Sequence, residues 1–191
     1  VLCVSSGTAA FKVALKELGI GRGDEVITQS FNFIATVEAI VDTGANVVFT
    51  DIDDTLNMCP KNLETLISKK TKAIIPVHML GVPADMILIN RIGKRTRIPV
   101  VEDACEAIGA KVAGKDVGGL SEFGVFSFDF GKMITTGEGG ALFSKKKSDG
   151  KNARMYHDHG HKNIPNLPRG LDHAGLSGFN YRMTEISGAF G

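Results

Sequence analysis

Hydrophobic residues along the first hundred positions alternate between helical spacing and short, unbroken apolar runs. Helical spacing predicts helices, and apolar runs bounded by turn residues are typical of buried strands. The predicted helices are Ala9–Leu18, Ile34–Val41, Leu63–Ser68 and Ala84–Lys94. The predicted strands are Val1–Val4, Glu25–Thr28, Val47–Ile52, Ala73–His78 and Ile98–Glu102. Strands that are apolar on both faces and alternate with helices indicate a mainly parallel sheet with helices on both sides.

The second half of the chain departs from this rhythm. Glycine and aromatic residues dominate Gly109–Gly140, and strands are predicted at Phe123–Phe128 and Gly140–Ser144. No internal repeat, low-complexity tract or linker divides the sequence, so we expect one domain across residues 1–191. The final residues, Thr184–Gly191, look like a helix cut in its middle. We therefore expect the sequence to be an excerpt of a longer protein.

The composition is that of an ordinary soluble globular protein. Of the 191 residues, 43% are hydrophobic and 23% are charged, which is enough apolar material for one sizeable core. The net charge of +1 indicates neither a nucleic-acid partner nor a membrane surface. No stretch has the length or the flanks of a signal peptide or a membrane span. The three cysteines are odd in number and widely spaced, which favours reduced thiols and a cytoplasmic location.

Three segments resemble nucleotide or nucleic-acid motifs only superficially. Gly19–Gly23 follows a helix and precedes a strand, which reverses the order required of a dinucleotide-binding loop. Gly131–Lys132 lacks the upstream glycine of a phosphate-binding P-loop. The run Lys145–Lys147 lies beside Ser148–Gly150 and is typical of a solvated turn. None of these segments predicts a nucleotide or nucleic-acid site.

Three other features together match what pyridoxal 5'-phosphate (PLP) presents to a protein: a phosphate, a pyridine nitrogen and an aldehyde. Ser5–Thr8 lies between a strand and a helix, so it could bind phosphate or simply cap the helix. Asp103 follows a predicted parallel strand, where it could hold a protonated pyridine nitrogen or serve as a turn residue. Lys132 stands among aromatic residues, methionine and glycines, and apolar surroundings would make its amine more nucleophilic. An ordinary lysine of an exposed hairpin is the competing interpretation of Lys132.

Seven short motifs follow one another in order over nearly the whole chain: Ser6–Ala10, Gly23–Thr28, Pro76–His78, Glu102–Ala104, Ser127–Lys132, Thr136–Gly140 and Gly178–Glu185. Together they resemble the DegT/DnrJ/EryC1/StrS family of PLP-dependent sugar aminotransferases. The resemblance implies the large PLP-binding domain of a fold type I aminotransferase, a three-layer α/β/α fold with a mainly parallel mixed sheet. It also implies a homodimer with active sites at the interface, and a longer protein with an extreme N-terminus and a small C-terminal domain beyond this sequence.

The resemblance assigns roles to five residues of these motifs. Lys132 would hold PLP as a Schiff base and act as the catalytic residue. Asp103 would bind the pyridine nitrogen of PLP. Ser127 would bind the phosphate together with the backbone amides of Gly7 and Thr8.

Three further residues are implied to contact the cofactor. Phe33 matches the position of the aromatic side chain that stacks on the cofactor ring, although a core phenylalanine would look the same. Asn180 resembles the residue that reaches the phosphate bound by the neighbouring subunit. Glu106 departs from the family, because many relatives have Gln or His at this position near the cofactor's 3'-oxygen. A carboxylate there would repel a phenolate oxygen unless one of the two is protonated.

The resemblance also implies a reaction. An amino group, in this family usually from glutamate, would move onto a keto sugar, most often a nucleotide-linked sugar. Lys132 favours transamination over the dehydration catalysed by relatives that carry His in its place. The same fold also serves desulfuration and non-catalytic, regulatory proteins. The cysteines lie outside any obvious catalytic loop, which disfavours desulfuration, and Lys132 together with Asp103 disfavours a purely regulatory role.

Four of the five histidines lie close together, three of them in His157–His161 and the fourth at His173. No cysteine or carboxylate set completes a metal site around them. A solvent-facing loop is one interpretation, and a patch that recognises an anionic substrate, with Arg169, is the other. The segment resembles transaminases that make 8-amino-3,8-dideoxy-manno-octulosonate, so that sugar acid is a second candidate for the product.

Overall fold

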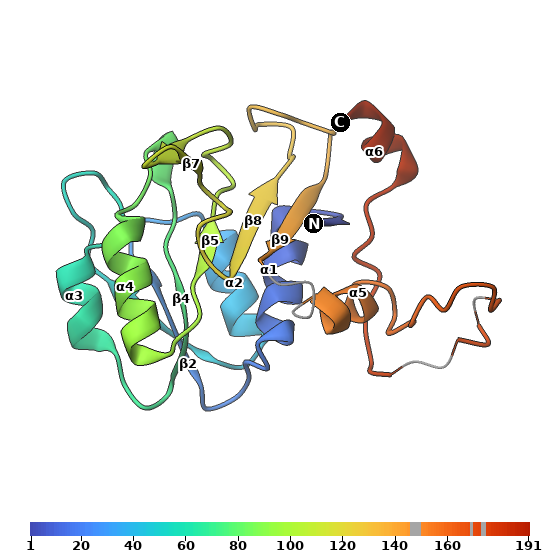
Figure 1. Cartoon of the computed structure of the whole chain (residues 1–191), viewed down its shortest axis with the longest axis horizontal. Coiled ribbons are helices and arrows are strands. Elements are labelled where there is room, and N and C mark those ends of the chain that lie inside the picture. The colour runs from blue at the N-terminus through green and yellow to red at the C-terminus, as the bar shows by residue number, and fades with distance from the viewer. Residues whose placement is uncertain (146–149, 169, 173–174) are drawn as a thin grey trace.

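The computed structural model describes residues 1–145, 150–168, 170–172 and 175–191 (Figure 1). The helices are α1 (Gly7–Glu17), α2 (Ile34–Asp42), α3 (Pro60–Leu66), α4 (Met86–Thr96), α5 (Lys151–Tyr156) and α6 (Glu185–Phe190), with a 3-10 turn η1 at Met79–Gly81. The strands are β1 (Leu2–Val4), β2 (Glu25–Gln29), β3 (Asn46–Thr50), β4 (Thr71–Ile75), β5 (Val101–Asp103), β6 (Lys111–Val112), β7 (Lys115–Asp116), β8 (Phe123–Ser127) and β9 (Gly140–Ser144). All the helices and strands predicted from the hydrophobic pattern are present.

The main strands form a mixed sheet in the order β3-β2-β4-β5-β8-β9-β1. β2 pairs in parallel with both β3 and β4, and β5 pairs in parallel with β8. Two parallel bridges, Ile74 to Val100 and Val77 to Asp103, join β4 to β5 and so connect the two halves of the sheet. β9 runs antiparallel to both of its neighbours, β8 and β1. The prediction of a mainly parallel mixed sheet is confirmed.

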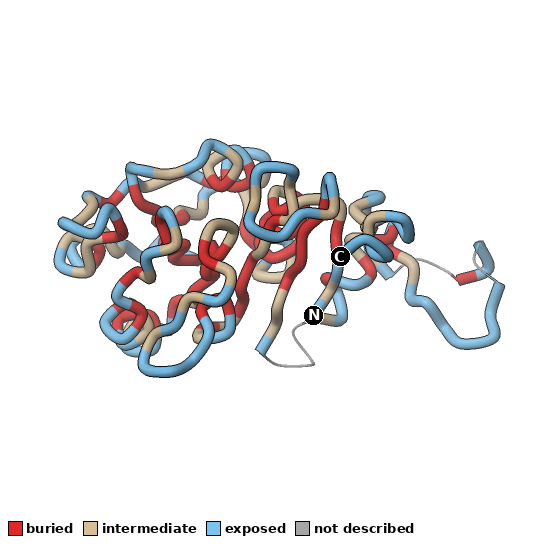
Figure 2. Tube along the Cα trace, turned by 90° about the horizontal axis from the view of Figure 1, so that it is seen from above, coloured by how far each residue is buried: buried red, intermediate tan, exposed pale blue. Residues whose placement is uncertain are grey.

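Alternate residues of each strand supply two hydrophobic cores, one on each face of the sheet. Val26 and Ile75 pack with α1 and α2 in one core. Their neighbours Ile27 and Ile74 pack with α3 and α4 in the other. In Figure 2 the buried residues lie in the interior of the part of the molecule that holds the sheet, and the exposed residues lie at its outside. The result is the predicted three-layer α/β/α arrangement.

Some element boundaries differ from the predicted ones because of local capping. α3 begins at Pro60 instead of Leu63, since proline suits the first turn of a helix. α4 begins at Met86 instead of Ala84, because the side chain of Asp85 accepts the Leu88 N–H and caps the helix. The prediction of a buried first strand is wrong in part. β1 is an edge strand in which Cys3 is exposed and Val4 is the fully buried residue.

The described part of residues 150–191 extends away from the sheet and is called the arm below (Figure 1). The arm begins with α5, which packs against α1, and ends with α6, where a helix was predicted at Thr184–Gly191. Between them the chain is mostly exposed and without regular structure. Among the described residues, no helix has both the length and the apolar character needed to cross a membrane.

Candidate active site

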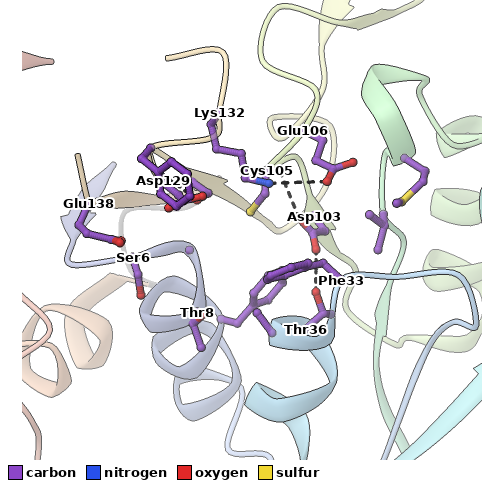
Figure 3. Close-up of a pocket in the computed structure, with 17 residues that line it drawn as sticks. Ser6, Thr8, Phe33, Thr36, Asp103, Cys105, Glu106, Asp129, Lys132 and Glu138 are labelled. Atoms are coloured by element: carbon purple, nitrogen blue, oxygen red, sulfur yellow. Dashed lines mark hydrogen bonds and ion pairs between the residues drawn. The ribbon is translucent and has the colours of Figure 1, made fainter. Parts of the chain in front are cut away.

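A cavity of about 420 Å³ lies at the carboxyl ends of β5 and β8 and at the first turn of α1. Its volume falls within the range of about 300–1,000 Å³ that is usual for small-molecule sites. Seven of the eight residues predicted to bind the cofactor line this cavity: Gly7, Thr8, Phe33, Asp103, Glu106, Ser127 and Lys132. Figure 3 shows Ser6 and Thr8 at one side of it and Glu106 at the other. The fold therefore brings together residues that are far apart in the sequence.

The first turn of α1 and the end of β8 form one side of the cavity. Ser6 is the N-cap of α1, and its side chain accepts the Ala9 N–H at 3.1 Å. The capping interpretation is therefore confirmed for Ser6. The first N–H groups of a helix have no carbonyl partner within it, so the amides of Gly7 and Thr8 suit an anion. A Cβ at Gly7 would lie 3.1 Å from the Cβ of Ser127, so glycine allows this close approach of α1 to β8.

Asp103 is the last residue of β5 and only 4% exposed. Its carboxylate accepts a hydrogen bond from the Thr36 hydroxyl at 2.8 Å and from the Cys105 N–H at 3.2 Å. Burial raises the pKa of the Asp103 carboxyl above its ordinary value, and the two hydrogen bonds oppose that shift. A cationic partner would stabilise this charge, so the geometry suits a protonated ring nitrogen.

No pattern in the sequence identified Thr36, although it is part of the site. It lies in the first turn of α2, is 1% exposed and also lines the cavity. The sequence signal that could have identified Thr36 is its spacing from Phe33, because residues three apart on a helix lie on the same face. Phe33 is the N-cap residue of α2, and 63% of it is exposed at the cavity. The interpretation of Phe33 as a core residue is wrong.

Lys132 lies in the connection between β8 and β9, and its side chain turns into the cavity. The Nζ atom is 3.6 Å from Oε1 of Glu106 and 5.9 Å from the centroid of the Phe33 ring. The expected apolar surroundings are wrong, since Phe130 and Met133 are 80% and 69% exposed. The interpretation as an exposed hairpin lysine is also wrong, because only 20% of the side chain is accessible. The amine is shielded by side chains from elsewhere in the fold, among them Glu106 and Phe33.

Glu106 connects Lys132 to the turn at η1. One carboxylate oxygen faces Lys132, and the other accepts the backbone N–H of Leu80 at 3.0 Å. Leu80 has a φ of 53°, a conformation that costs a branched side chain some strain. The Glu106 carboxylate is thus held by two partners. Its predicted role beside the cofactor's 3'-oxygen stays a prediction.

Asn180 is the one predicted cofactor residue that does not line the cavity. It is exposed in the arm, where it forms a bridge with Asp158 and accepts the Arg182 N–H at 3.3 Å. The structure contains a single chain, so the predicted contact with a neighbouring subunit stays a prediction.

The histidine segment is a loop of the arm in which His159 is exposed and His157 and His161 are partly buried. Within the described part of the chain, no group of His, Cys, Asp and Glu could hold a metal ion. Arg169 and His173, which were expected to belong to the same patch, lie outside the described residues, as do Lys146 and Lys147. The substrate patch stays a prediction.

Comparison with known proteins decides the family. Residues 1–191 match the DegT/DnrJ/EryC1/StrS aminotransferase family. The chain belongs to this family. It is 41% identical over 191 residues to the GDP-perosamine synthase of Caulobacter vibrioides, covering 100% of this chain and 50% of that protein. It is also 41% identical to the pleiotropic regulatory protein of Geobacillus stearothermophilus, covering 96% of this chain and 48% of that protein.

A solved relative supports the fold and the cofactor. NtdA of Bacillus subtilis with bound cofactor PMP superposes with a TM-score of 0.90 at 32% identity, over 99% of this chain and 42% of that one. The predicted family, fold type and cofactor are confirmed, since PMP is the aminated form of PLP. The chain spans about half the length of the curated relatives it matches.

The residues that line the cavity fit PLP. They include helix N–H groups and a serine hydroxyl for a phosphate, a buried carboxylate for a ring nitrogen, and a partly shielded amine for an aldehyde. An exposed aromatic ring, Phe33, provides a surface on which a planar ring can stack. Each chemical feature of the cofactor thus has a complementary group in one cavity.

Proposed function

We propose that the protein to which this chain belongs is a PLP-dependent aminotransferase that moves an amino group, from glutamate, onto a keto sugar. The observation that carries the proposal is the convergence of Lys132, Asp103 and the first turn of α1 on one cavity. When bound, PLP supplies an aldehyde for amines and an electron sink for the carbanion that transamination requires. The remaining chemistry falls to the side chains of this chain.

Asp103, Ser127, Gly7, Thr8 and Phe33 would bind and orient the cofactor. The Asp103 carboxylate would hold a proton on the ring nitrogen, because an opposite charge nearby favours the protonated form. The Ser127 hydroxyl and the two α1 amides would bind the phosphate, where the helix dipole favours an anion. Phe33 would cover one face of the ring. These contacts would fix the ring relative to Lys132.

Lys132 would attach the cofactor and, once released, move a proton at the reacting carbon as a general base. Glu106 lies beside its amine and is itself held by the Leu80 N–H, so it can orient the amine. The presence of this lysine supports transamination over sugar dehydration. The similarity to a pleiotropic regulatory protein supports a regulatory relative as the second candidate function, and Lys132 with Asp103 argues against a loss of catalysis.

We further propose that the working enzyme is a homodimer with its active sites at the interface. The cavity is lined by the carboxylates of Asp103, Glu106, Asp129 and Glu138 but, among the described residues, by a single basic side chain, Lys132. A phosphate dianion and an anionic donor therefore need compensating groups from outside this cavity. Asn180 of a second copy would supply one of them.

The curated relatives are about twice as long as this chain. We therefore propose that residues 1–191 are the large PLP-binding domain, and that a small C-terminal domain and the extreme N-terminus lie beyond them. A cytoplasmic location is part of the proposal, and the three free cysteines support it.

For the substrate we propose a nucleotide-linked keto sugar, with a keto sugar acid, the precursor of 8-amino-3,8-dideoxy-manno-octulosonate, as the second candidate. Similarity to a GDP-perosamine synthase supports the nucleotide-linked sugar. The partly buried His157 and His161 in the arm would then belong to a patch for the anionic part of either substrate. Such a sugar would serve the biosynthesis of a cell-surface polysaccharide.

The test is to locate the cofactor on the full-length protein. After incubation with PLP and reduction with borohydride, mass spectrometry should find the adduct on Lys132, and Lys132→Ala should lose both the adduct and the visible absorbance. Lys145→Ala is the matched control, because Lys145 is exposed and donates to the Leu120 carbonyl outside the cavity. Glutamate should convert the bound cofactor to its amino form. An adduct that persists in Lys132→Ala would refute the assignment.

A further inference from the structure

A buried polar cluster lies on the face of the sheet opposite the cavity, directly behind Asp103. Glu102 and Asp103 are consecutive residues of β5, so their side chains point to opposite faces. Asp103 faces α2 through Thr36, whereas Glu102 faces the α4 side and is 0% exposed. A carboxylate this deeply buried is costly unless its oxygens are fully hydrogen-bonded.

Four donors converge on the Glu102 carboxylate. Oε1 accepts the backbone N–H groups of Leu120 at 2.8 Å and Ser121 at 2.7 Å. Oε2 accepts the Gly118 N–H at 2.7 Å and lies 3.2 Å from Nε2 of His78. One side chain of β5 therefore orders the whole turn that leads into β8.

His78 is 0% exposed and holds two consecutive residues of β5 at once. Its backbone N–H donates to the Asp103 carbonyl at 3.0 Å, and its ring contacts the Glu102 carboxylate. Nδ1 of the ring accepts the Ala84 N–H at 3.1 Å, so the proton of a neutral ring lies on Nε2 and points to Glu102. The ring is thus fixed in one tautomer, with a donor on one side and an acceptor on the other.

The turn ordered by Glu102 packs against β8 without a gap. A Cβ at Gly124 would lie 1.8 Å from the Gly118 carbonyl oxygen, and a Cβ at Gly118 would lie 2.2 Å from the Phe126 ring. Movement of the turn would therefore displace β8, which carries Ser127 into the cavity. The cluster behind the sheet connects to both Asp103 and Ser127, but none of its side chains lines the cavity.

We propose that Glu102 and His78 are positioning residues that hold the end of β5, and with it the Asp103 carboxylate, in register with the cofactor ring. The proposal rests on the function proposed above, in which Asp103 binds the ring nitrogen. Side chains behind the residues that contact a bound group commonly change affinity about tenfold or more when they are replaced. Glu102 and His78 act here from the face that the cofactor does not reach.

The test is a double-mutant cycle on the full-length protein, with the dissociation constant for PLP as the readout. Glu102→Gln keeps the volume but places an amide N–H₂ against backbone N–H donors. It should weaken PLP binding about tenfold in the parent protein and less than about twofold in an Asp103→Asn background. An equal loss in both backgrounds would show a general structural role and overturn the proposal.

His78 provides a second pair of variants in case Glu102→Gln does not fold. His78→Gln keeps a donor at the Nε2 position and should retain PLP affinity, whereas His78→Asn loses that donor and should behave like Glu102→Gln. The matched control is Ser121→Ala, which removes the bond of the Ser121 hydroxyl to Asn90 in the same turn but keeps the backbone donor to Glu102. Equal affinities of His78→Gln and His78→Asn would also refute the proposal.

Failure of the proposed function and failure of the positioning role give different results. If the parent protein forms no Lys132 adduct, the proposed function fails. If the parent forms the adduct and Glu102→Gln binds PLP as tightly as the parent does, the function stands and the positioning role is refuted.

Discussion

The sheet body (residues 1–145) and the arm (residues 150–191) differ in how far contacts within the chain fix the positions of their candidate functional residues. In the sheet body, Thr36 and Asp103 at the cavity form one buried hydrogen-bonded pair, and His78 and Glu102 behind the sheet form another. In the arm, most of the described residues are exposed (Figure 2), and the candidate residue Asn180 does not line the cavity. The sheet body therefore brings seven of the candidate residues together within the chain, whereas Asn180 would join them only through the second copy proposed above.

The arm is nonetheless attached at defined points. The Ala153 N–H donates to the Glu17 carboxylate at 2.5 Å, and the Ser5 N–H donates to the Tyr181 carbonyl at 2.8 Å. Within the arm, Arg182 forms an ion pair with the buried Asp158. These contacts hold its two ends beside α1 and β1, while the described loop residues between them are mostly exposed. We therefore expect the arm to open locally without unfolding of the sheet.

The largest expected effect concerns Asp103 in the sheet body. Asp103→Asn should reduce transaminase activity by at least about a hundredfold, because a charge at the reacting ring is lost. The same change should stabilise the cofactor-free protein at neutral pH, since it removes a charge whose burial raises the pKa of the Asp103 carboxyl. Thr36 can accept the new amide N–H₂ through its hydroxyl, so the hydrogen bonds of the site can be kept.

The pH dependence of this stability gain has a definite sign. A carboxyl with a raised pKa in the folded protein costs no stability below its ordinary value of 3.8, and the cost grows as the pH rises through the raised value. Thermal unfolding of both cofactor-free proteins from acidic to neutral pH measures it. The stability difference should vanish at low pH, and a difference that grows on acidification would contradict the burial argument.

The next effect concerns Asn180 in the arm. If the proposed dimer is correct, Asn180→Ala should weaken PLP binding by roughly tenfold in the assembled protein, because the phosphate contact proposed for Asn180 of a second copy would be lost. The unfolding temperature of the cofactor-free protein should change little, since Asn180 is exposed and the variant removes one exposed hydrogen bond, from the Arg182 N–H. Titration with PLP, together with sedimentation to establish the oligomeric state, measures both. Asn152, an exposed asparagine on α5, provides the control variant Asn152→Ala. An equal loss of PLP affinity in that variant would contradict a specific role of Asn180.

The fold was predictable from the sequence because its signals are local. Apolar runs, helical spacing and turn residues each act over a few positions, and they placed Asp103 near the end of a parallel strand. The partners of Asp103 and Glu102 were not predictable in this way. Thr36 lies 67 residues from Asp103, and His78 lies 24 residues from Glu102. Such pairs depend on strand order and register, which no local pattern specifies.

The surroundings of Lys132 were also not predictable from its neighbours in the sequence. Its flanking residues suggested an apolar environment, but Phe130 and Met133 are exposed and its contacts are Glu106 and Phe33. Neighbours in a loop do not alternate as they do in a strand, so flanking composition says little about what a side chain contacts. The motif around Lys132 identified the residue correctly as a member of the cavity, although its surroundings were wrongly predicted.

A smaller effect should follow from loosening the arm at Asp158. Asp158→Ala removes the ion pair with Arg182 and the hydrogen bond from the Asn163 side chain. Water can still solvate the partly exposed Arg182, so the loss should be at least about 1 kcal/mol. Because the pair lies within the arm, amide hydrogen exchange should become about fivefold faster there and stay unchanged in β5 and β8. Hydrogen exchange followed by mass spectrometry resolves the two regions. Equal acceleration in the sheet would mean that the arm and the sheet unfold together.

The smallest effect distinguishes the two regions by their response to acid. Burial lowers the pKa of His157 below its ordinary value of 6.5, so the neutral ring contributes stability above that pH. This contribution is lost as the pH falls through the lowered value, which is the opposite direction from Asp103. Hydrogen exchange in the arm should therefore accelerate slightly on acidification, after correction for the intrinsic rates. His157→Asn keeps a donor for the Arg154 carbonyl but does not titrate, so it should abolish this acid response and leave the sheet unaffected. A response that persists in His157→Asn would assign the acid sensitivity of the arm to another group.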